Sequence, residues 1–424
     1  MQSFLALKKS EIDLNFGVIN MAEENRLSVI EQALLDLLAN SLSGCSRSVS
    51  VCADEWDYIW HEAYVQAVPL TAFANGVSSD IPLEMASHIK SKISEIVLSV
   101  SRRIGEHIFL HKLLTEAGID YTIIKGFACS LYYPDPLTRW LGDVDFLVNP
   151  DDEESVANLL IDKGFTEIST IGENHRVFNY RGCRYELHTE PAGIPNGETG
   201  EIVKDYLSDT ISKAKYQNTV FGQLKTPDEF HHGLIMLLHM SHHLNGEGIG
   251  LRHLCDWAVF VSDIGVEKFE ELFEEPLKEM GLWKFALVLN HVCGKFLGCS
   301  EYVTEDEKME ELSVAFLSDL FAGGNLGQKS DNRAHEALAL SESPDRSYIK
   351  NLFNSANRIV YKNWGFCRKV KILLPVGWLF FGLRYAFRSL KGERPRIDLR
   401  EIKKETVKRK DLYSRLKIFI KEDK

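Results

Sequence analysis

Apolar residues along the first 117 positions recur every three or four residues, which is the period of helices that are apolar on one side. This spacing predicts helices over 25–42, 55–67 and 83–117. Gly118 follows the third of them, at the position where a glycine commonly ends a helix. The pattern therefore predicts an N-terminal helical region over 1–117.

Beyond Gly118 the period shortens to two, and short runs rich in β-formers are bounded by turn residues. They predict strands over 121–125, 144–148, 165–169, 176–180 and 184–188, with one compact helix over 151–163. Acidic residues in the first turn of that helix and Gly164 at its end support it. Residues 118–226 should therefore form a small mixed β-sheet core.

From Pro227 the helical spacing returns, and helices are predicted over 230–244, 251–264, 266–280 and 283–297. Residues 301–343 are polar, acidic and interrupted by Gly and Ser, which predicts a mobile connector in at least part of them. The whole pattern predicts an α+β fold. A helical domain over 227–345 and a basic C-terminal region over 346–424 follow the sheet.

Composition is that of a soluble globular protein, with 45% hydrophobic and 26% charged residues. The formal net charge of −12 argues against a protein that coats nucleic acid along its whole surface. The charge is uneven, because residues 358–424 hold 20 Lys and Arg against 7 Asp and Glu. This basic tail leaves nucleic acid open as a partner.

The cellular compartment is predicted from the absence of disulfide motifs, a secretory signal and a membrane-spanning run. None of the eight cysteines forms a C-x-x-C pair, and a chain of this size needs no disulfides to fold, so reduced thiols are expected. The N-terminus lacks the basic stretch and apolar run of a secretory signal, and no run of about 18 uncharged apolar residues occurs. These features predict a cytoplasmic protein.

Candidate chemistry begins with Asp143-Val144-Asp145 in a predicted strand. Residues two apart on a strand point to one face, so the two carboxylates should lie together while Val144 packs behind them. Two close carboxylates repel each other unless a cation lies between them, and Mg²⁺ binds carboxylate and phosphate oxygens. The pair therefore predicts a metal site, against the alternative of a solvated strand edge.

Three neighbouring features favour the metal site. Glu186 supplies a third acid in a later predicted strand. Lys125-Gly126 ends the preceding strand, where a glycine lets the backbone approach a phosphate. Arg139 lies shortly before the acidic pair, where its guanidinium could clamp a phosphate. The expected metal ligands are Asp143, Asp145 and Glu186, and the expected phosphate contacts are Lys125, Gly126 and Arg139.

In these features the chain resembles the nucleotidyltransferase superfamily, whose signature is a glycine, a spacer, Asp-x-Asp in a strand and a third acid in a later strand. More narrowly, it resembles a bacterial family of uncharacterised nucleotidyltransferases over roughly residues 50 to 265. It departs from the superfamily at Phe127, where a small residue usually helps to hold the triphosphate. The matching residues are Trp56, Gly118-Ile119, Ile124-Lys125-Gly126, Tyr133-Pro134-x-Pro136, Arg139, Asp143-Val144-Asp145, Glu186-Leu187-His188, His239 and Leu254-Cys255-Asp256-Trp257.

The resemblance implies that residues 118–226 form a nucleotidyltransferase core like the palm of DNA polymerase beta. It also implies an NTP such as ATP as substrate and two Mg²⁺ ions held by the three acids, with Mn²⁺ as an alternative. The implied reaction transfers NMP from the NTP to a hydroxyl acceptor by two-metal catalysis; the acceptor does not follow from the sequence. The alternative from another class is a non-catalytic or toxin-like nucleotide-binding module, and the complete set of acids favours the enzyme.

Three further residues are candidates for the surroundings of the site or for its acceptor side. His188 shares the strand face of the third acid, and either activates the acceptor or is a satisfied strand histidine. Asp256 lies in an apolar helix, where it either pairs with Arg252 or backbone, or positions the acceptor. His239 and His243 are four apart on a predicted helix; packing near the site is favoured over transition-metal binding, and His239 could face the nucleotide.

The basic tail contains an apolar segment over 372–383, with Arg and Lys residues on both sides. Twelve residues are too few to span a bilayer as a helix. The segment is either a core helix of the C-terminal region or an interfacial segment that contacts an anionic membrane through 368–388. The second alternative predicts an accessory protein of polysaccharide or peptide biosynthesis, attached peripherally to the inner face of the membrane.

Overall fold

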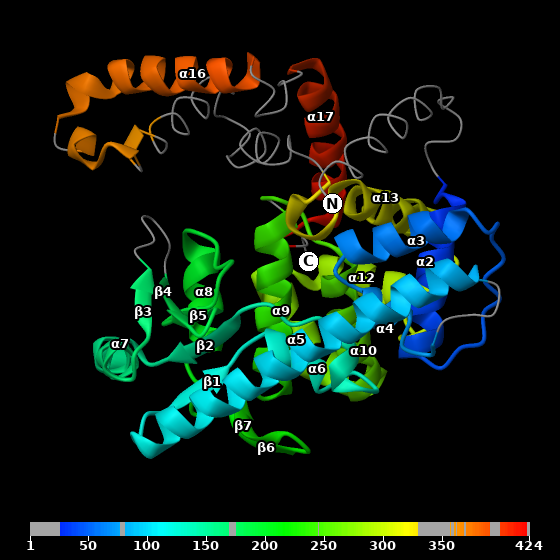
Figure 1. The fold of residues 1–424 in the computed structure, drawn as a ribbon, viewed down its shortest axis with the longest axis horizontal. Helices are drawn as coiled ribbons and strands as arrows, with labels where there is room; N and C mark the ends of the chain where they lie inside the picture. The colour runs from blue at the N-terminus through cyan, green and yellow to red at the C-terminus, as the bar shows by residue number, and fades with distance from the viewer. Residues whose placement is uncertain are drawn as a thin grey trace.

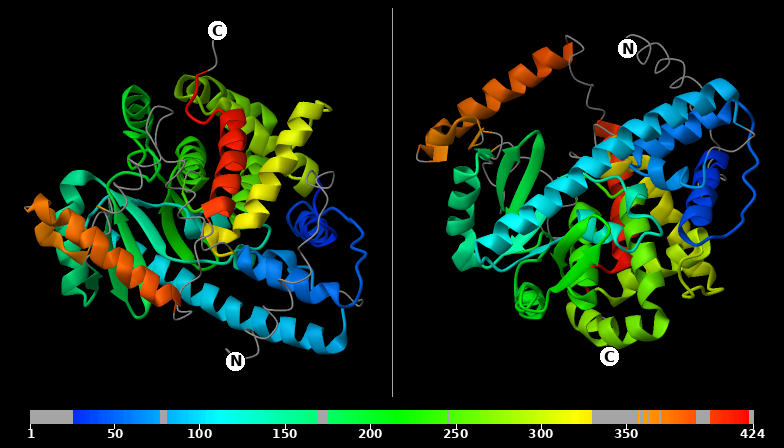
Figure 2. Two further views of the ribbon diagram at one scale, coloured as in Figure 1. Left: turned by 90° about the horizontal axis from the view of Figure 1, so that it is seen from above. Right: turned by 60° about the horizontal axis from the view of Figure 1, so that its bottom comes forward.

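The computed structural model describes residues 26–76, 81–168, 175–244, 246–329, 357, 360–361, 363–368, 370–390 and 399–421. A mixed sheet lies on one side and a body of helices on the other, and the long helix α5 (Leu83–Glu116) reaches from one to the other (Figures 1 and 2). The predicted α+β fold is confirmed. The N-terminal segment that was expected to lack a secretory signal falls outside the described residues.

The N-terminal helices form where the apolar spacing predicted them, with slightly shorter ends. They are α2 (Val29–Leu42), α3 (Glu55–Val65) and α5, with the short α4 (Pro69–Ala72) between them. Ser28 and Glu31 begin α2 with a reciprocal cap: the Glu31 amide donates to Ser28 Oγ at 3.3 Å, and the Ser28 amide donates to Glu31 Oε2 at 2.7 Å. Pro69 begins α4, because proline fits the first turn of a helix.

Five strands form the sheet in the order β1-β2-β5-β4-β3. Their bounds are β1 (Tyr121–Ile123), β2 (Val144–Val148), β3 (Thr166–Ile168), β4 (His175–Tyr180) and β5 (Cys183–His188). The central strands β2 and β5 run parallel, and the other neighbouring pairs are antiparallel. All five were predicted to within a few residues. The separate hairpin of β6 (Lys215–Thr219) and β7 (Gly222–Thr226) was missed, because its strands carry few apolar residues.

The remaining α-helices are α6 (Gly126–Ser130), α7 (Glu153–Asp162), α8 (Glu198–Leu207), α9 (Glu229–Leu244), α10 (Leu251–Ile264), α11 (Val266–Met280), α12 (Trp283–Leu297), α13 (Glu307–Gly323), α16 (Leu374–Leu390) and α17 (Leu399–Leu416). Short 3-10 turns are η1 (Pro136–Thr138), η2 (Pro150–Asp152), η3 (Asn325–Gly327), η4 (Gly365–Arg368) and η5 (Lys371–Leu373). Part of the connector predicted over 301–343 forms the helix α13, because Leu312, Phe316 and Leu320 bury one of its faces. The rest of that segment, from residue 330, lies outside the described residues.

Two large cores hold the sheet and most of the helices, and α16 packs in a third, small cluster. One face of the sheet packs against α5 and α7, and Val144, Phe146 and Val148 are fully buried in that layer, as the strand alternation predicted. The second core joins the N-terminal helices α2 to α4 with α9 to α13 and α17. The predicted N-terminal region and the predicted helical domain therefore share one core. The opposite face of the sheet remains for polar chemistry.

Buried histidines in this body predict an acid-sensitive fold. His232 on α9 packs against the rings of Tyr132 and Phe260, and burial lowers its pKa to about 4 from 6.5. The unfolded chain therefore takes up a proton near pH 6.5, and the folded chain only near pH 4. The free energy of unfolding should fall as pH drops through this window, by no more than about 3 kcal/mol from this residue.

Urea unfolding at pH 7.5 and pH 5 measures this contribution. His232→Gln should lose less stability on acidification than the wild type, because it removes one buried imidazole. His61→Gln is the matched control, since His61 is exposed on α3. Equal losses in His232→Gln and the wild type would show that His232 does not contribute.

Candidate functional site

The three predicted acids meet on the face of the sheet that the core leaves open. Asp145 and Glu186 are register partners in the parallel pair of β2 and β5, so their side chains lie side by side. Asp143 stands just before β2, and Arg184 links it to the others: Arg184 Nε is 3.6 Å from Asp143 Oδ2 and 2.8 Å from Glu186 Oε1. The structure thus brings the three carboxylates into one cluster.

The electrostatics of this cluster are those of crowded carboxylates. Burial and the negative charges of Asp145 and Glu186 raise the pKa of Asp143 to about 6. Burial alone would also raise the pKa of Asp145, but Lys125 and His188 lower it. Carboxylates that repel each other this way are the donor set that a divalent cation neutralises, so the residues present fit the implied metal.

Lys125 points into the cluster, and its Nζ lies 3.1 Å from Asp145 Oδ1. Its backbone is in the left-handed region, with φ of 55° in the turn between β1 and α6, and Gly126 follows with φ of 42°. A side chain held at positive φ stores about 1–3 kcal/mol of strain, which the surrounding structure must impose. Strain at this turn is consistent with a functional position for Lys125 and Gly126.

Phe127, where the chain departs from the superfamily pattern, points the other way. Its ring is fully buried in the sheet core, beside the rings of His107 and Phe221 at 5.5 and 6.1 Å. The large side chain therefore fills the core rather than the face that carries the acids.

Arg139 lies in a buried network on the helical side of the site. Its Nε and one terminal nitrogen donate to the two carboxylate oxygens of Asp256, both at 2.7 Å, and the Tyr133 hydroxyl donates to Asp256 Oδ1 at 2.8 Å. Arg139 is 5% exposed and Asp256 is 6% exposed. Because this bidentate pair occupies the fork of the guanidinium, Arg139 holds η1 to α10 in the structure. Asp256 thus pairs with Arg139 rather than with Arg252.

His188 and a second histidine, His175, complete the polar face. His188 Nε2 lies 3.1 Å from Asp145 Oδ1 and 3.5 Å from Glu186 Oε2. His175 on β4 is the register partner of His188, and its Nε2 lies 3.6 Å from Glu186 Oε2. His175 was not predicted from the sequence, because only the register of β4 against β5 places it there.

A group of histidines on α9 and α10 lies near the acids and near Arg252. The ring centroid of His239 lies 4.4 Å from that of His243 and 5.5 Å from that of His253. Burial, followed by the positive charge of Lys125, lowers the pKa of His239. The buried Nε of Arg252 has no hydrogen-bond partner within the described ranges. From the sequence, Arg252 was expected only as a possible partner of Asp256.

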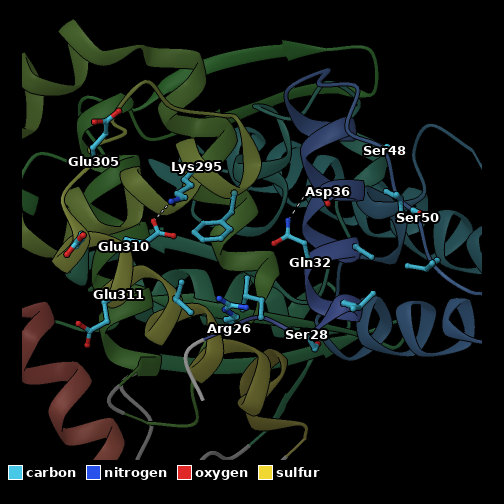
Figure 3. A pocket seen from close by; sticks show the side chains of 18 of the residues that line it. Arg26, Ser28, Gln32, Asp36, Ser48, Ser50, Lys295, Glu305, Glu310 and Glu311 are labelled. Carbon is cyan, nitrogen blue, oxygen red and sulfur yellow. Dashed lines mark hydrogen bonds and ion pairs between the residues drawn. The ribbon is translucent and has the colours of Figure 1, made fainter. Parts of the chain in front are cut away.

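A cavity of about 920 Å³ lies elsewhere, between α2, α12 and α13 (Figure 3). Lys295 and Glu310 form an ion pair on one wall, and Gln32 donates to Asp36 at 3.1 Å along α2, which forms another. Neither the three acids nor the histidines and arginines around them line this cavity. It is therefore separate from the acidic cluster.

Comparison with known proteins places the chain in a family. Among solved structures it is similar to the crystal structure of an antigenic nucleotidyltransferase-like protein from Paracoccidioides brasiliensis, with 14% sequence identity and a TM-score of 0.28. That match covers 49% of this chain and 94% of the other. No curated protein matches the sequence. A family model matches residues 53–298, more than half of the chain, and the chain therefore belongs to the family of uncharacterised nucleotidyltransferases.

Proposed function

We propose that this protein is a metal-dependent nucleotidyltransferase that moves NMP from an NTP to a hydroxyl acceptor. The observation that carries the proposal is the cluster of Asp143, Asp145 and Glu186 on one face of β2 and β5, within a chain of this family. A solvated strand edge would leave all of these carboxylates exposed, whereas the side chains of Asp145 and Glu186 are each 14% exposed and that of Asp143 is 41% exposed. Enclosed carboxylates this close together favour a bound cation.

In this proposal the three acids hold two Mg²⁺ ions, with Mn²⁺ as the alternative. Bound divalent ions would lower the pKa of the acceptor hydroxyl and neutralise the charge of the leaving pyrophosphate. The remaining residues orient the groups that react. Lys125 lies within reach of both the carboxylates and a substrate phosphate, and the turn at Gly126 brings backbone close to the same place.

Arg252 is proposed as the phosphate contact that the sequence analysis assigned to Arg139. Arg139 is fully engaged with Asp256, whereas the Nε of Arg252 is buried without a partner in the described part of the chain. Arg139 also lies near enough to lower the pKa of Arg252, together with burial. A buried guanidinium beside other cationic groups is stabilised when an anion binds, and a triphosphate is such an anion.

Arg252→Ala should therefore raise the KM for NTP by about 10- to 100-fold, the value of one or two hydrogen bonds to a charged group. The effect on kcat should be smaller, because the acids remain. Steady-state kinetics with saturating metal measures both constants. The control is Lys278→Ala, which removes an exposed cation on α11. An unchanged KM in Arg252→Ala would remove Arg252 from the phosphate site.

The experiment that tests the proposed function is incubation of the protein with each of the four NTPs and Mg²⁺ or Mn²⁺. Cell extract serves as the source of acceptor, and pyrophosphate release is measured. Release that needs the metal and one of the NTPs is expected. No release above the extract alone, with any NTP, would favour the non-catalytic nucleotide-binding module instead.

A second candidate role, contact with an anionic membrane, is favoured by the exposure of α16. Apolar side chains at helical spacing are exposed along one side of α16: Val376 at 55%, Leu379 at 65%, Phe380 at 48% and Leu383 at 63%. Ile372, in η5 just before it, is 83% exposed. In Figures 1 and 2, α16 lies at the edge of the molecule, apart from the helical body. Such exposure does not fit a core helix.

The other side of α16 packs locally, and basic residues flank the exposed side. Leu374 is buried with Val360 and Cys367, and Trp378 packs against this small cluster. Lys371 and Arg384 are exposed at either end of the apolar face. No helix in the described ranges is long and apolar enough to cross a bilayer. An apolar face between cations favours a helix that lies in the interface of an anionic membrane.

Co-sedimentation with vesicles of anionic phospholipid at low salt tests this role. The wild type should pellet, and Leu379→Asp should reduce the bound fraction several-fold, because it puts a charge on the inserted face. Leu98→Asp is the matched control, since Leu98 is 70% exposed on α5. Equal pelleting of Leu379→Asp and the wild type would exclude contact through α16.

A further inference from the structure

Two imidazoles join the carboxylates at the proposed site, and this changes the metal that the site should bind. β4 and β5 are antiparallel, and His175 stands directly opposite His188. Glu186 is two residues before His188 on the same strand, so it shares their face. One ligand atom from each of these three side chains lies within 4.8 Å of the other two.

The spacing is close to that of a coordination sphere. Two ligands bonded to one ion at about 2.1 Å cannot be more than about 4.2 Å apart, so small side-chain rotations would bring all three atoms onto one ion. Both imidazoles are shielded from solvent, with side-chain exposures of 20% for His175 and 4% for His188. The ring centroids are 4.8 Å apart. Asp145 adds a further carboxylate oxygen 3.1 Å from His188 Nε2.

The ligand types distinguish between metals. Mg²⁺ is bound by oxygen atoms and retains several waters, so an imidazole adds little to its affinity. Ions of the first transition series, Mn²⁺ among them, accept both imidazole nitrogen and carboxylate oxygen, and two histidines with one carboxylate leave positions open for a substrate. A site made only of the three carboxylates would not favour Mn²⁺ over Mg²⁺ in this way.

We propose that His175, Glu186 and His188 bind a transition-metal ion, with Mn²⁺ in preference to Mg²⁺, as one of the two ions of the site. The catalytic meaning of this ion rests on the proposed function; its binding does not. The simpler role for the histidines is to orient Asp145 and Glu186 by hydrogen bonds. The two roles differ in one observable, since only a ligand puts its nitrogen in direct contact with the metal.

The experiment titrates Mn²⁺ into the full-length protein without nucleotide and records pulsed electron paramagnetic resonance spectra. The wild type should show hyperfine coupling from directly bound imidazole nitrogen. His175→Gln should weaken this coupling and lower Mn²⁺ affinity by at least about 10-fold, since even indirect partners of a metal commonly contribute about 10- to 100-fold. His61→Gln should behave as the wild type. Mg²⁺ should displace the bound Mn²⁺ only in more than about 10-fold excess.

Glu186→Gln provides a second variant and should also weaken Mn²⁺ binding, so the test does not depend on one folded variant. Bound Mn²⁺ without nitrogen coupling, or an affinity unchanged in His175→Gln, would overturn the proposal. The outcome is separable from that of the proposed function. Nitrogen coupling in a protein that turns over no NTP would support this metal site and contradict the proposed nucleotidyltransferase activity. NTP turnover by a protein without nitrogen coupling would support that activity and contradict this metal site.

Discussion

Asp145→Asn is expected to lower metal-dependent NTP turnover by more than about 100-fold while the protein stays folded. Loss of an indirect partner of a metal already lowers activity or affinity by about 10- to 100-fold, and Asp145 is proposed to touch the metal itself. The amide keeps the shape of the side chain and one oxygen that can accept from Lys125 and His188. Because Lys125 and His188 lower the pKa of Asp145, its charge contributes to stability, and the substitution should lower the free energy of unfolding without unfolding the protein.

Pyrophosphate release and thermal unfolding of the same preparation separate the two effects. Glu186→Gln should reproduce the loss of activity, since Glu186 is the register partner of Asp145. Asp151→Asn is the control, because Asp151 is exposed at the start of η2 and outside the cluster. Activity within a few-fold of the wild type in both site variants would contradict the role of the acids.

Asp256→Asn is expected to produce the largest loss of stability, about 3–5 kcal/mol in the free energy of unfolding. The substitution leaves the buried charge of Arg139 without its carboxylate, and Arg252 adds a second positive charge nearby. The pair connects η1 to α10 across 117 positions of the chain, so no local structure replaces it.

Urea unfolding measures this loss, with Glu274→Gln as the control. Glu274 pairs with Lys278 on the surface of α11, and loss of an exposed helix pair should leave stability nearly unchanged. Replacing both partners, Arg139→Met with Asp256→Leu, should recover part of the loss because no charge remains buried. A change below about 1 kcal/mol in Asp256→Asn would show that the pair does not hold these elements together.

The acidic site could be predicted from the sequence because two of its three acids are close neighbours in the chain. Asp143 and Asp145 are two residues apart on one strand, and alternation alone puts them on one face. Glu186 joins them only through the parallel pairing and register of β5 on β2, which the sequence pattern does not give. The structure places all three acids in one cluster.

The contacts that the sequence did not reveal join residues far apart in the chain. Nothing local to Arg139 indicates that Asp256 occupies its guanidinium, so its sequence suggested a free phosphate clamp. His175 acquires its place only from the register of β4 on β5. Arg252 stands out only because burial leaves its Nε without a partner among the described residues. These contacts form between elements far apart in the chain, and the periodicity of the sequence does not reveal them.

Helices and strands with a clear apolar period were predicted from the sequence, and those without one were missed. Amphipathic helices and alternating strands were found because burial on one side leaves a period in the sequence. The hairpin of β6 and β7 was missed because Lys215-Tyr216-Gln217-Asn218-Thr219 has no apolar alternation. For α13, the acidic and Gly-rich surroundings concealed Leu312, Phe316 and Leu320, which bury one face of a regular helix.

The most direct test of nucleotidyl transfer uses one NTP labelled at the α-phosphate and, in parallel, at the γ-phosphate. The protein is incubated with each label, divalent metal and extract, and the label on the acceptor is measured. Nucleotidyl transfer predicts that the α-label reaches the acceptor, that the γ-label leaves with pyrophosphate, and that Glu186→Gln abolishes both. Transfer of the γ-label to the acceptor, or α-labelling that persists in Glu186→Gln, would contradict nucleotidyl transfer by the acids of β2 and β5.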